Sequence, residues 1–132
     1  VHKAAFQAEC SNDIFLTGYF PHETFPELYR GSEACIFPSV NEGVGLPVLE
    51  AMSSGIPVAC AKAGALTEIG GNNVLYFDSD NIEEMASVME KIATDKDLRQ
   101  KLITGSLEWT KRFSWEKTGE LTLELIKSVA AK

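Results

Sequence analysis

The sequence predicts an α/β domain in which a parallel sheet lies between two layers of helices, and three observations support this. Short β-rich runs alternate with segments of helical pattern. The expected strands are continuous apolar runs, as is typical of strands covered on both faces. The 132 residues, 45% hydrophobic and 23% charged, suit one ordinary globular domain with a real core.

The expected elements follow from these patterns and from local stop and start signals. Strands are expected at Ile14–Leu16, Ala34–Phe37, Pro57–Ala59 and Val74–Phe77. Helices are expected at about His22–Arg30, Pro47–Ser54, Leu66–Ile69, Ile82–Thr94, Lys96–Lys111 and Trp115–Ala130. Asp80 with Glu83 forms a capping box, Ser114 suits an N-cap, and Gly55 occupies the place of a C′ residue. Trp109, Phe113 and Trp115 are expected to pack where a helix bends back onto the domain.

Composition excludes several classes of protein. A net charge of −7 argues against non-specific nucleic-acid binding, which depends on Lys and Arg contacts to phosphates. No apolar run approaches the roughly 18 residues of a membrane span, and Val1–Cys10 lacks the apolar stretch of a signal peptide. Cys10, Cys35 and Cys60 are widely spaced, which favours buried free thiols over a disulfide or a metal site. A reducing, cytoplasmic location is therefore expected.

The most informative segment is 37–58, where two carboxylates flank a glycine-rich turn. Gly43 and Gly45 let backbone amides approach a ligand, because neither has a Cβ. Pro47 suits the first position of a helix, whose N-terminus favours an anion such as phosphate. Glu42 and Glu50 would repel phosphate alone, but they can accept hydrogen bonds from hydroxyl groups. This segment therefore predicts a site for a nucleotide-sugar, which has a sugar, a ribose and a diphosphate.

The same residues resemble a known family. Glu42 and Glu50 are separated by seven residues, and Gly55-Ile-Pro-Val58 follows. This arrangement is similar to the donor-binding signature of one family of retaining glycosyltransferases with the GT-B fold. The family is called glycosyltransferase family 4, or "glycosyl transferases group 1". Other matching segments occur in the family's order: Ile14–Phe20, Leu28–Ser39 and Phe113–Glu116.

The resemblance implies a role for individual residues. Glu42 would be the catalytic-site carboxylate that accepts hydrogen bonds from the donor sugar, and Glu50 would hold the ribose hydroxyls. The amides of Gly43, Val44, Gly45 and Leu46 would face the sugar and the diphosphate, with Val44 in place of the family's more common Phe. The turn that contains Gly18 and Tyr19 would hold the nucleobase, largely through backbone groups.

The resemblance also implies what the whole enzyme does. It would transfer a hexose from a UDP-, GDP- or ADP-sugar to an acceptor hydroxyl in glycan, glycolipid or polysaccharide synthesis, without a metal or other cofactor. Residues 1–132 would be a single, N-terminally truncated C-terminal domain. The acceptor would bind an N-terminal domain, and the basic residues that grip the diphosphate would precede Val1. The isolated chain is expected to transfer no sugar, and the full-length enzyme could lie at the inner membrane face.

Some readings of the sequence stay open beside this one. Asp78-Ser-Asp80 has the Asp-x-Asp form of a GT-A metal site, but a helix cap is favoured because Glu83 follows. His22 and His2 are expected to be surface or helix-start residues rather than catalytic ones. A non-catalytic Rossmann-like binding or assembly module is an alternative function, and a GT-B sugar epimerase or phosphorylase is another.

The family's sheet has six strands in the order 3-2-1-4-5-6, and the strands expected here correspond to the third to the sixth. The first two, central strands would be absent, which leaves unpaired edges that favour association. We therefore expect one of two outcomes. Either Ile14–Leu16 docks directly on Ala34–Phe37, or the open edges pair between two chains as a homo-oligomer.

Overall fold

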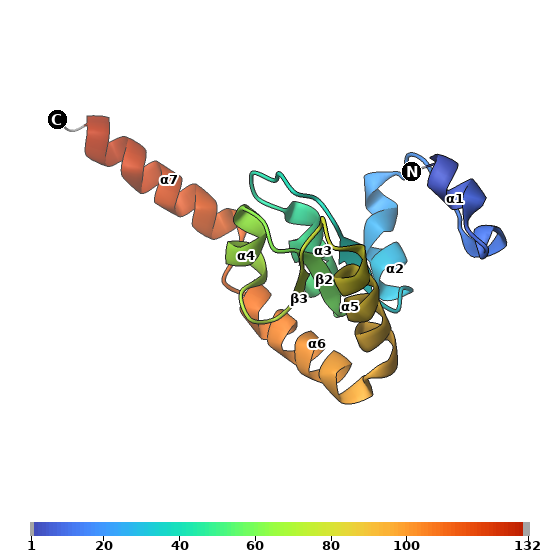
Figure 1. Ribbon diagram of the computed structural model, residues 1–132. Helices are drawn as coiled ribbons and strands as arrows, with labels where there is room; N and C mark the ends of the chain where they lie inside the picture. Colours follow the sequence, from blue (N-terminus) through green and yellow to red (C-terminus); the bar gives the residue numbers. More distant parts are fainter. Residues whose placement is uncertain (1, 131–132) are drawn as a thin grey trace.

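The computed structural model describes residues 2–130 and has a parallel sheet at its centre (Figure 1). The sheet consists of β1 (Cys35–Phe37), β2 (Val58–Ala61) and β3 (Leu75–Phe77), hydrogen-bonded in the order β1-β2-β3. Both pairings are parallel. The α/β class and the strands expected near residues 34–37, 57–59 and 74–77 are confirmed.

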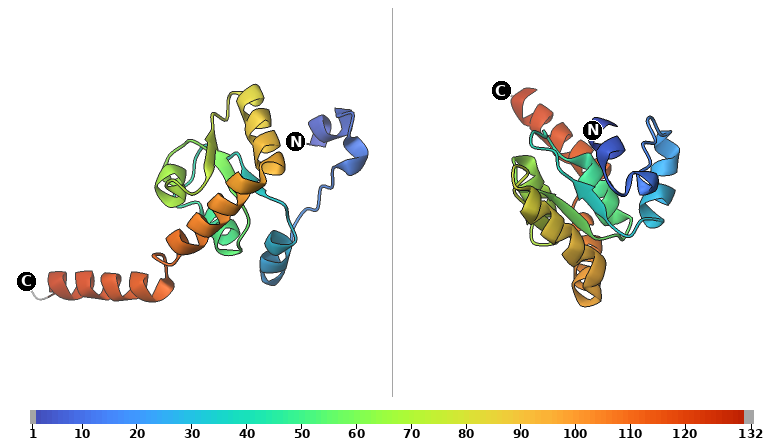
Figure 2. Two further views of the ribbon diagram at one scale, coloured as in Figure 1. Left: turned by 90° about the horizontal axis from the view of Figure 1, so that it is seen from below. Right: turned by 45° about the vertical axis from the view of Figure 1, so that its right-hand side comes forward.

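Helices cover both faces of this sheet. Their bounds are α1 His2–Gln7, α2 Phe25–Arg30, α3 Leu46–Ser53, α4 Ala65–Gly70, α5 Ile82–Thr94, α6 Lys96–Thr110 and α7 Trp115–Ala130, with short 3-10 turns η1 at Ser11–Asp13 and η2 at His22–Thr24. α3 packs against β1 and β2, whereas α5 packs against β2 and β3. Figure 2 shows α3 and α5 on opposite faces, which is the expected three-layer arrangement.

The core lies where α3 meets the middle strand. Val48 and Met52 of α3 are fully buried, as are Val58 of β2 and Leu66 of α4. Phe77 at the end of β3 is 1% exposed. A continuous apolar contact of this kind supplies most of the free energy that offsets chain entropy.

α6 closes the core from outside by polar contacts as well as apolar ones. The Ser106 hydroxyl, fully buried, donates a hydrogen bond to the Asn73 carbonyl at 3.0 Å. The Trp109 Nε1–H donates to the Ile69 carbonyl at 2.7 Å, which satisfies a backbone group near the end of α4. The expected packing role of Trp109 is thereby confirmed, whereas Trp115 is 77% exposed and that expectation is wrong.

The caps agree with the sequence at two helices and differ at one. Ser114 Oγ accepts from the Lys117 N–H at 3.1 Å, so it caps α7 as expected. Gly55 follows α3 with φ +78°, the left-handed conformation of a C′ glycine. At α5 the expected Asp80–Glu83 box is wrong, because Asn81 is the N-cap and its side chain accepts from the Glu84 N–H at 3.0 Å.

The strand expected at Ile14–Leu16 is also wrong. These residues lie in an irregular segment between η1 and η2, and Phe15 is 81% exposed. Three apolar residues do not form a strand unless a neighbour accepts their hydrogen bonds, and β1 pairs with β2 alone. Docking of this segment on β1 is therefore not observed. Pairing between two chains stays a prediction, which a monomer in light scattering would rule out.

Both ends of the chain extend away from the sheet (Figures 1 and 2). The N-terminal arm, residues 2–21, carries exposed Phe6, Phe15 and Tyr19. The C-terminal arm, α7, is exposed along its length and includes Leu121 and Leu125 at 56% and 65% exposed. Among the described residues, none of the helices has the length and apolar character that a membrane crossing requires.

Candidate functional site

The loop before α3 contains two glycines that serve different purposes. Gly45 is the N-cap of α3 with φ +84°, and a Cβ there would lie 2.5 Å from Leu66 Cδ2. The turn and the close packing of α4 thus both require glycine at this position. A Cβ on Gly43 would meet no atom within 4 Å. Gly43 is therefore not required by packing, and its backbone is open to an approaching ligand.

α3 begins directly after this loop. The N–H groups of Val48 and Leu49 both donate to the Gly45 carbonyl, at 3.0 and 3.4 Å. Pro47 is the second residue of the helix rather than the expected first, which still costs no intrahelical hydrogen bond. Val44 and Leu46 are 50% and 45% exposed, so the N-terminus of α3 has an apolar rim.

Glu42 lies in the loop and is held by a neighbour. The Ser39 hydroxyl donates to Glu42 Oε1 at 2.7 Å, and both residues are half-buried. The bond fixes one oxygen of the carboxylate in a loop that follows β1. In open parallel sheets, ligands bind beyond the carboxyl ends of strands, which is where this loop lies.

Glu50 is the fifth residue of α3, beyond its first turn. Glu50 therefore does not lie where an acid favours the helix macrodipole, since α3 has no acidic residue in its first turn. The Tyr29 hydroxyl of α2 donates to Glu50 Oε2 at 3.5 Å. The hydroxyls of Ser53 and Ser54 donate to the Glu50 carbonyl instead, at 3.0 and 2.8 Å.

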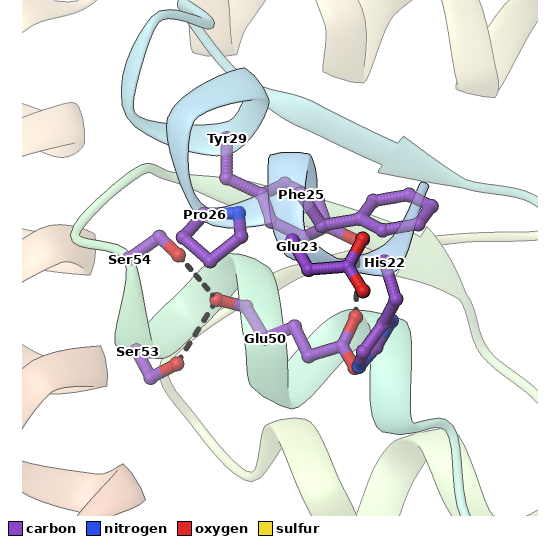
Figure 3. Close-up of a pocket in the computed structure, with 8 residues that line it drawn as sticks. All are labelled: His22, Glu23, Phe25, Pro26, Tyr29, Glu50, Ser53 and Ser54. Atoms are coloured by element: carbon purple, nitrogen blue, oxygen red, sulfur yellow. Dashed lines mark hydrogen bonds between the residues drawn. The ribbon is translucent and has the colours of Figure 1, made fainter. Parts of the chain in front are cut away.

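A cavity of about 300 Å³ adjoins Glu50, between α2 and α3. Figure 3 shows the side chains of Tyr29 and Glu50 directed toward one another from the two helices. The cavity is lined by His22, Glu23, Phe25, Pro26, Tyr29, Glu50, Ser53 and Ser54. Burial raises the pKa of the Tyr29 phenol to about 12, and Cys35 and Glu50 nearby add to the rise. At neutral pH Tyr29 is therefore a hydrogen-bond donor.

The other sequence-predicted residue pair lies elsewhere. Gly18 has φ +68° in the N-terminal arm, and Tyr19 is 91% exposed. Neither residue lines the cavity at Glu50, so contact of this turn with a nucleobase stays a prediction. His22 is exposed and begins η2, as expected of a helix-start histidine, and it also lines the cavity.

The described residues contain no group of three or more His, Cys, Asp or Glu side chains placed to hold a metal ion. Asp78 Oδ1 accepts from the Asp80 N–H at 3.0 Å, so the Asp-x-Asp sequence forms a local turn before α5. The cysteines are free: Cys60 is buried and Cys35 half-buried, but Cys10 is exposed, contrary to expectation. Transfer without a metal stays a prediction.

Sequence reasoning missed the two hydroxyls that hold the carboxylates. Ser39 and Tyr29 both lie within the segment Leu28–Ser39 that resembles the family. Ser39 is three residues from Glu42 and lies on the same loop, so its contact was within reach of a local argument. Tyr29 is 21 residues from Glu50, and only the packing of α2 on α3 brings them together.

Comparisons with known proteins agree on one family. A family model described as "Glycosyl transferases group 1" matches residues 1–109. The O-antigen chain mannosyltransferase B of Escherichia coli is 34% identical over 83% of this chain and 29% of its own length. A D-inositol 3-phosphate glycosyltransferase of Nocardioides is 33% identical over 72% of this chain and 21% of its own length. The chain thus spans less than a third of these relatives.

A solved structure has the same fold. The sucrose-phosphate synthase of Thermosynechococcus elongatus superposes with a TM-score of 0.90 over 98% of this chain and 33% of its own, at 22% sequence identity. This similarity confirms the expected α/β fold of the GT-B type.

Proposed function

The chain belongs to the family of glycosyl transferases group 1, and from this premise we propose that it is the donor-binding part of a retaining glycosyltransferase. The full-length enzyme transfers a hexose from a nucleoside diphosphate sugar to an acceptor hydroxyl. The products belong to glycan, glycolipid or polysaccharide synthesis. Because the free thiols Cys35 and Cys60 suit a reducing compartment, we assign this part to the cytoplasm.

The observation that supports this proposal is that both carboxylates keep unused hydrogen-bond acceptor capacity. Glu42 and Glu50 each accept one hydroxyl hydrogen bond, from Ser39 and Tyr29. Neither forms an ion pair within 4.0 Å among the described residues. A carboxylate has about four acceptor sites, so each of these has capacity for the hydroxyls of a ligand. Paired carboxylates that keep acceptor capacity suit a polyhydroxylated ligand better than a cation or a phosphate.

The proposal also gives the donor an orientation. Glu42 accepts from hydroxyls of the donor sugar, and Glu50 accepts from the ribose. The diphosphate lies between them, beside the open backbone at Gly43 and the N-terminus of α3, whose first N–H groups favour negative charge. As the sugar–phosphate bond breaks, these groups stabilise the departing diphosphate, while Glu42 holds the sugar and Glu50 holds the ribose.

The rest of the enzyme supplies what this chain does not. The chain spans 29% of the mannosyltransferase and 33% of the synthase chain, and we propose that the acceptor binds the remainder of the enzyme. We expect the isolated chain to transfer no sugar, since neither Lys62 nor Arg30 stands where the family's diphosphate-gripping residues do. Transfer by the purified 132-residue chain would contradict this part of the proposal.

The test replaces each carboxylate by its amide in the full-length protein. Glu42→Gln is expected to lower kcat/KM with UDP-, GDP- or ADP-sugars by about 10- to 100-fold, because a hydrogen bond to a charged group contributes roughly 1.5–3 kcal/mol. Glu50→Gln is expected to raise the donor KM by a similar factor. Glu83→Gln on the exposed first turn of α5 is the matched control. Equal rates in all three variants would refute the proposed function.

A further inference from the structure

The cavity beside Glu50 contains a contact between two side chains, one of which, Tyr29, has no role of its own in the proposed function. Tyr29 and Glu50 come from different helices, α2 and α3, and their side chains meet at the cavity wall (Figure 3). Tyr29 is half-buried and belongs to the apolar layer that packs against the core. Its ring is therefore fixed by packing, and its hydroxyl has one defined direction.

The hydrogen bond itself is long. The Tyr29 oxygen lies 3.5 Å from Glu50 Oε2, which is longer than the roughly 2.5–3.0 Å of an ordinary O–H···O bond. Hydrogen bonds in sites without ligand are often long and shorten when the ligand binds. The bond uses one acceptor site of Oε2, while Oε1 accepts no hydrogen bond from the described residues. Tyr29 thus orients the carboxylate and leaves Oε1 as the oxygen with the greater acceptor capacity for a ligand.

We propose that Tyr29 is a positioning residue for Glu50, which orients the carboxylate so that its other oxygen accepts from the ribose hydroxyls of the donor. Tyr29 acts through Glu50 and need not touch the donor itself. This inference rests on the proposed function of Glu50, and it adds a residue to the donor site from the preceding helix.

A purely structural role for Tyr29 makes different predictions. The ring packs beside Phe25, with ring centroids 6.1 Å apart, and Phe in place of Tyr would keep that contact. If only the ring mattered, Tyr29→Phe would leave donor binding unchanged. The hydroxyl could instead affect donor binding by stabilising the fold, without acting on Glu50. Its loss would then change the donor KM by the same factor whether or not Glu50 is present.

The first experiment measures the pairing without any ligand. The phenol of Tyr29 is titrated by NMR in the 132-residue chain, where its pKa is raised to about 12. Glu50→Gln is expected to lower that pKa but to leave it above 10.0, because burial is the largest cause of the rise. Glu23→Gln lines the same cavity and is the control, expected to leave the Tyr29 titration unchanged. An unchanged pKa in Glu50→Gln would overturn the pairing.

The second experiment is a double-mutant cycle on the donor KM of the full-length enzyme. Tyr29→Phe is expected to raise KM roughly tenfold, the equivalent of one neutral hydrogen bond, with little change in kcat. In the Glu50→Ala background, where position 50 has no acceptor for the Tyr29 hydroxyl, the same substitution is expected to have no further effect. An equal effect in both backgrounds would overturn the positioning role.

The two experiments separate the inference from its premise. If Glu50→Gln leaves the donor KM unchanged, the proposed function of Glu50 fails, and the positioning role fails with it. The Tyr29 titration then still shows whether the two side chains are paired in the fold. If Glu50→Gln raises KM but Tyr29→Phe does not, only the inference about Tyr29 is wrong.

Discussion

The sheet with its surrounding helices and the two terminal arms use apolar residues in opposite ways. In the sheet region, Met52 and Val58 are fully buried and Phe77 is 1% exposed. In the arms, Phe15 is 81% exposed and Trp115 is 77% exposed. The region from β1 to α6 therefore forms a core from its own residues. The apolar side chains of the arms do not pack into a core within the described residues.

This difference bears on function because the two carboxylates of the candidate site lie within the packed region from β1 to α6. Glu42 and Glu50 lie on a loop and a helix that are fixed by Gly45 and by the core face of α3. The predicted nucleobase contact at Gly18 and Tyr19 lies in the N-terminal arm instead. The packed region thus contains the two carboxylates that we propose hold the sugar and the ribose, whereas the proposed base contact lies in an arm outside that region.

The largest expected difference in the free energy of unfolding is between two substitutions to alanine, one of a phenylalanine in the packed region and one of a phenylalanine in the N-terminal arm. Phe77→Ala is expected to lower the free energy of unfolding by about 3–5 kcal/mol, because a buried Phe leaves a cavity. Phe15→Ala is expected to change it by less than about 0.5 kcal/mol, as for exposed positions in general. Urea unfolding followed by circular dichroism measures both. Similar losses at both positions would mean that the N-terminal arm belongs to the core.

A smaller effect is expected from the glycines of the site loop. Gly45→Ala is expected to lower the free energy of unfolding by about 2–4 kcal/mol, since φ is +84° and the new Cβ would meet Leu66. Gly43→Ala meets no atom and is expected to be neutral within about 0.5 kcal/mol. The measurement is again the urea midpoint. A destabilising Gly43→Ala would show that the loop packs more closely than we describe.

The smallest difference in stability is expected between substitutions of the two tryptophans on either side of the bend after α6. Trp109→Phe removes the hydrogen bond to the Ile69 carbonyl and is expected to cost about 1–2 kcal/mol, because that carbonyl loses its partner. Trp115→Phe, at an exposed position, is expected to cost less than about 0.5 kcal/mol. Thermal unfolding distinguishes them. Equal costs would place Trp115 in contact with the domain.

The sequence predicts best what is decided locally. α5 and α7 have the bounds that were expected, Ile82–Thr94 and Trp115–Ala130, because helical patterns and caps depend on neighbouring residues. The strand at Ile14–Leu16 was expected wrongly, because strand formation depends on a partner strand that the sequence does not reveal. An alternative cap was also overlooked, since Asn81 and Asp80 are both good N-cap residues.

In the candidate site, too, the sequence predicts the local features but not the contacts between distant residues. The loop from Glu42 to Leu46 and the start of α3 are a local motif, and the sequence places them within one residue. The hydroxyl of Tyr29 reaches Glu50 only because α2 packs on α3. The sequence alone gives no indication of that contact, although both residues belong to segments that resemble the family.

The central claim is that the segment 42–50, which comprises the loop after β1 and the start of α3, binds a nucleotide. NMR titration of the 132-residue chain with UDP, GDP and ADP tests this claim most directly. We predict weak binding of at least one nucleotide, with chemical-shift changes concentrated at the amides of residues 43–50 and lost in Glu50→Gln. Binding of none of the three, or shifts that lie elsewhere and persist in Glu50→Gln, would contradict the account.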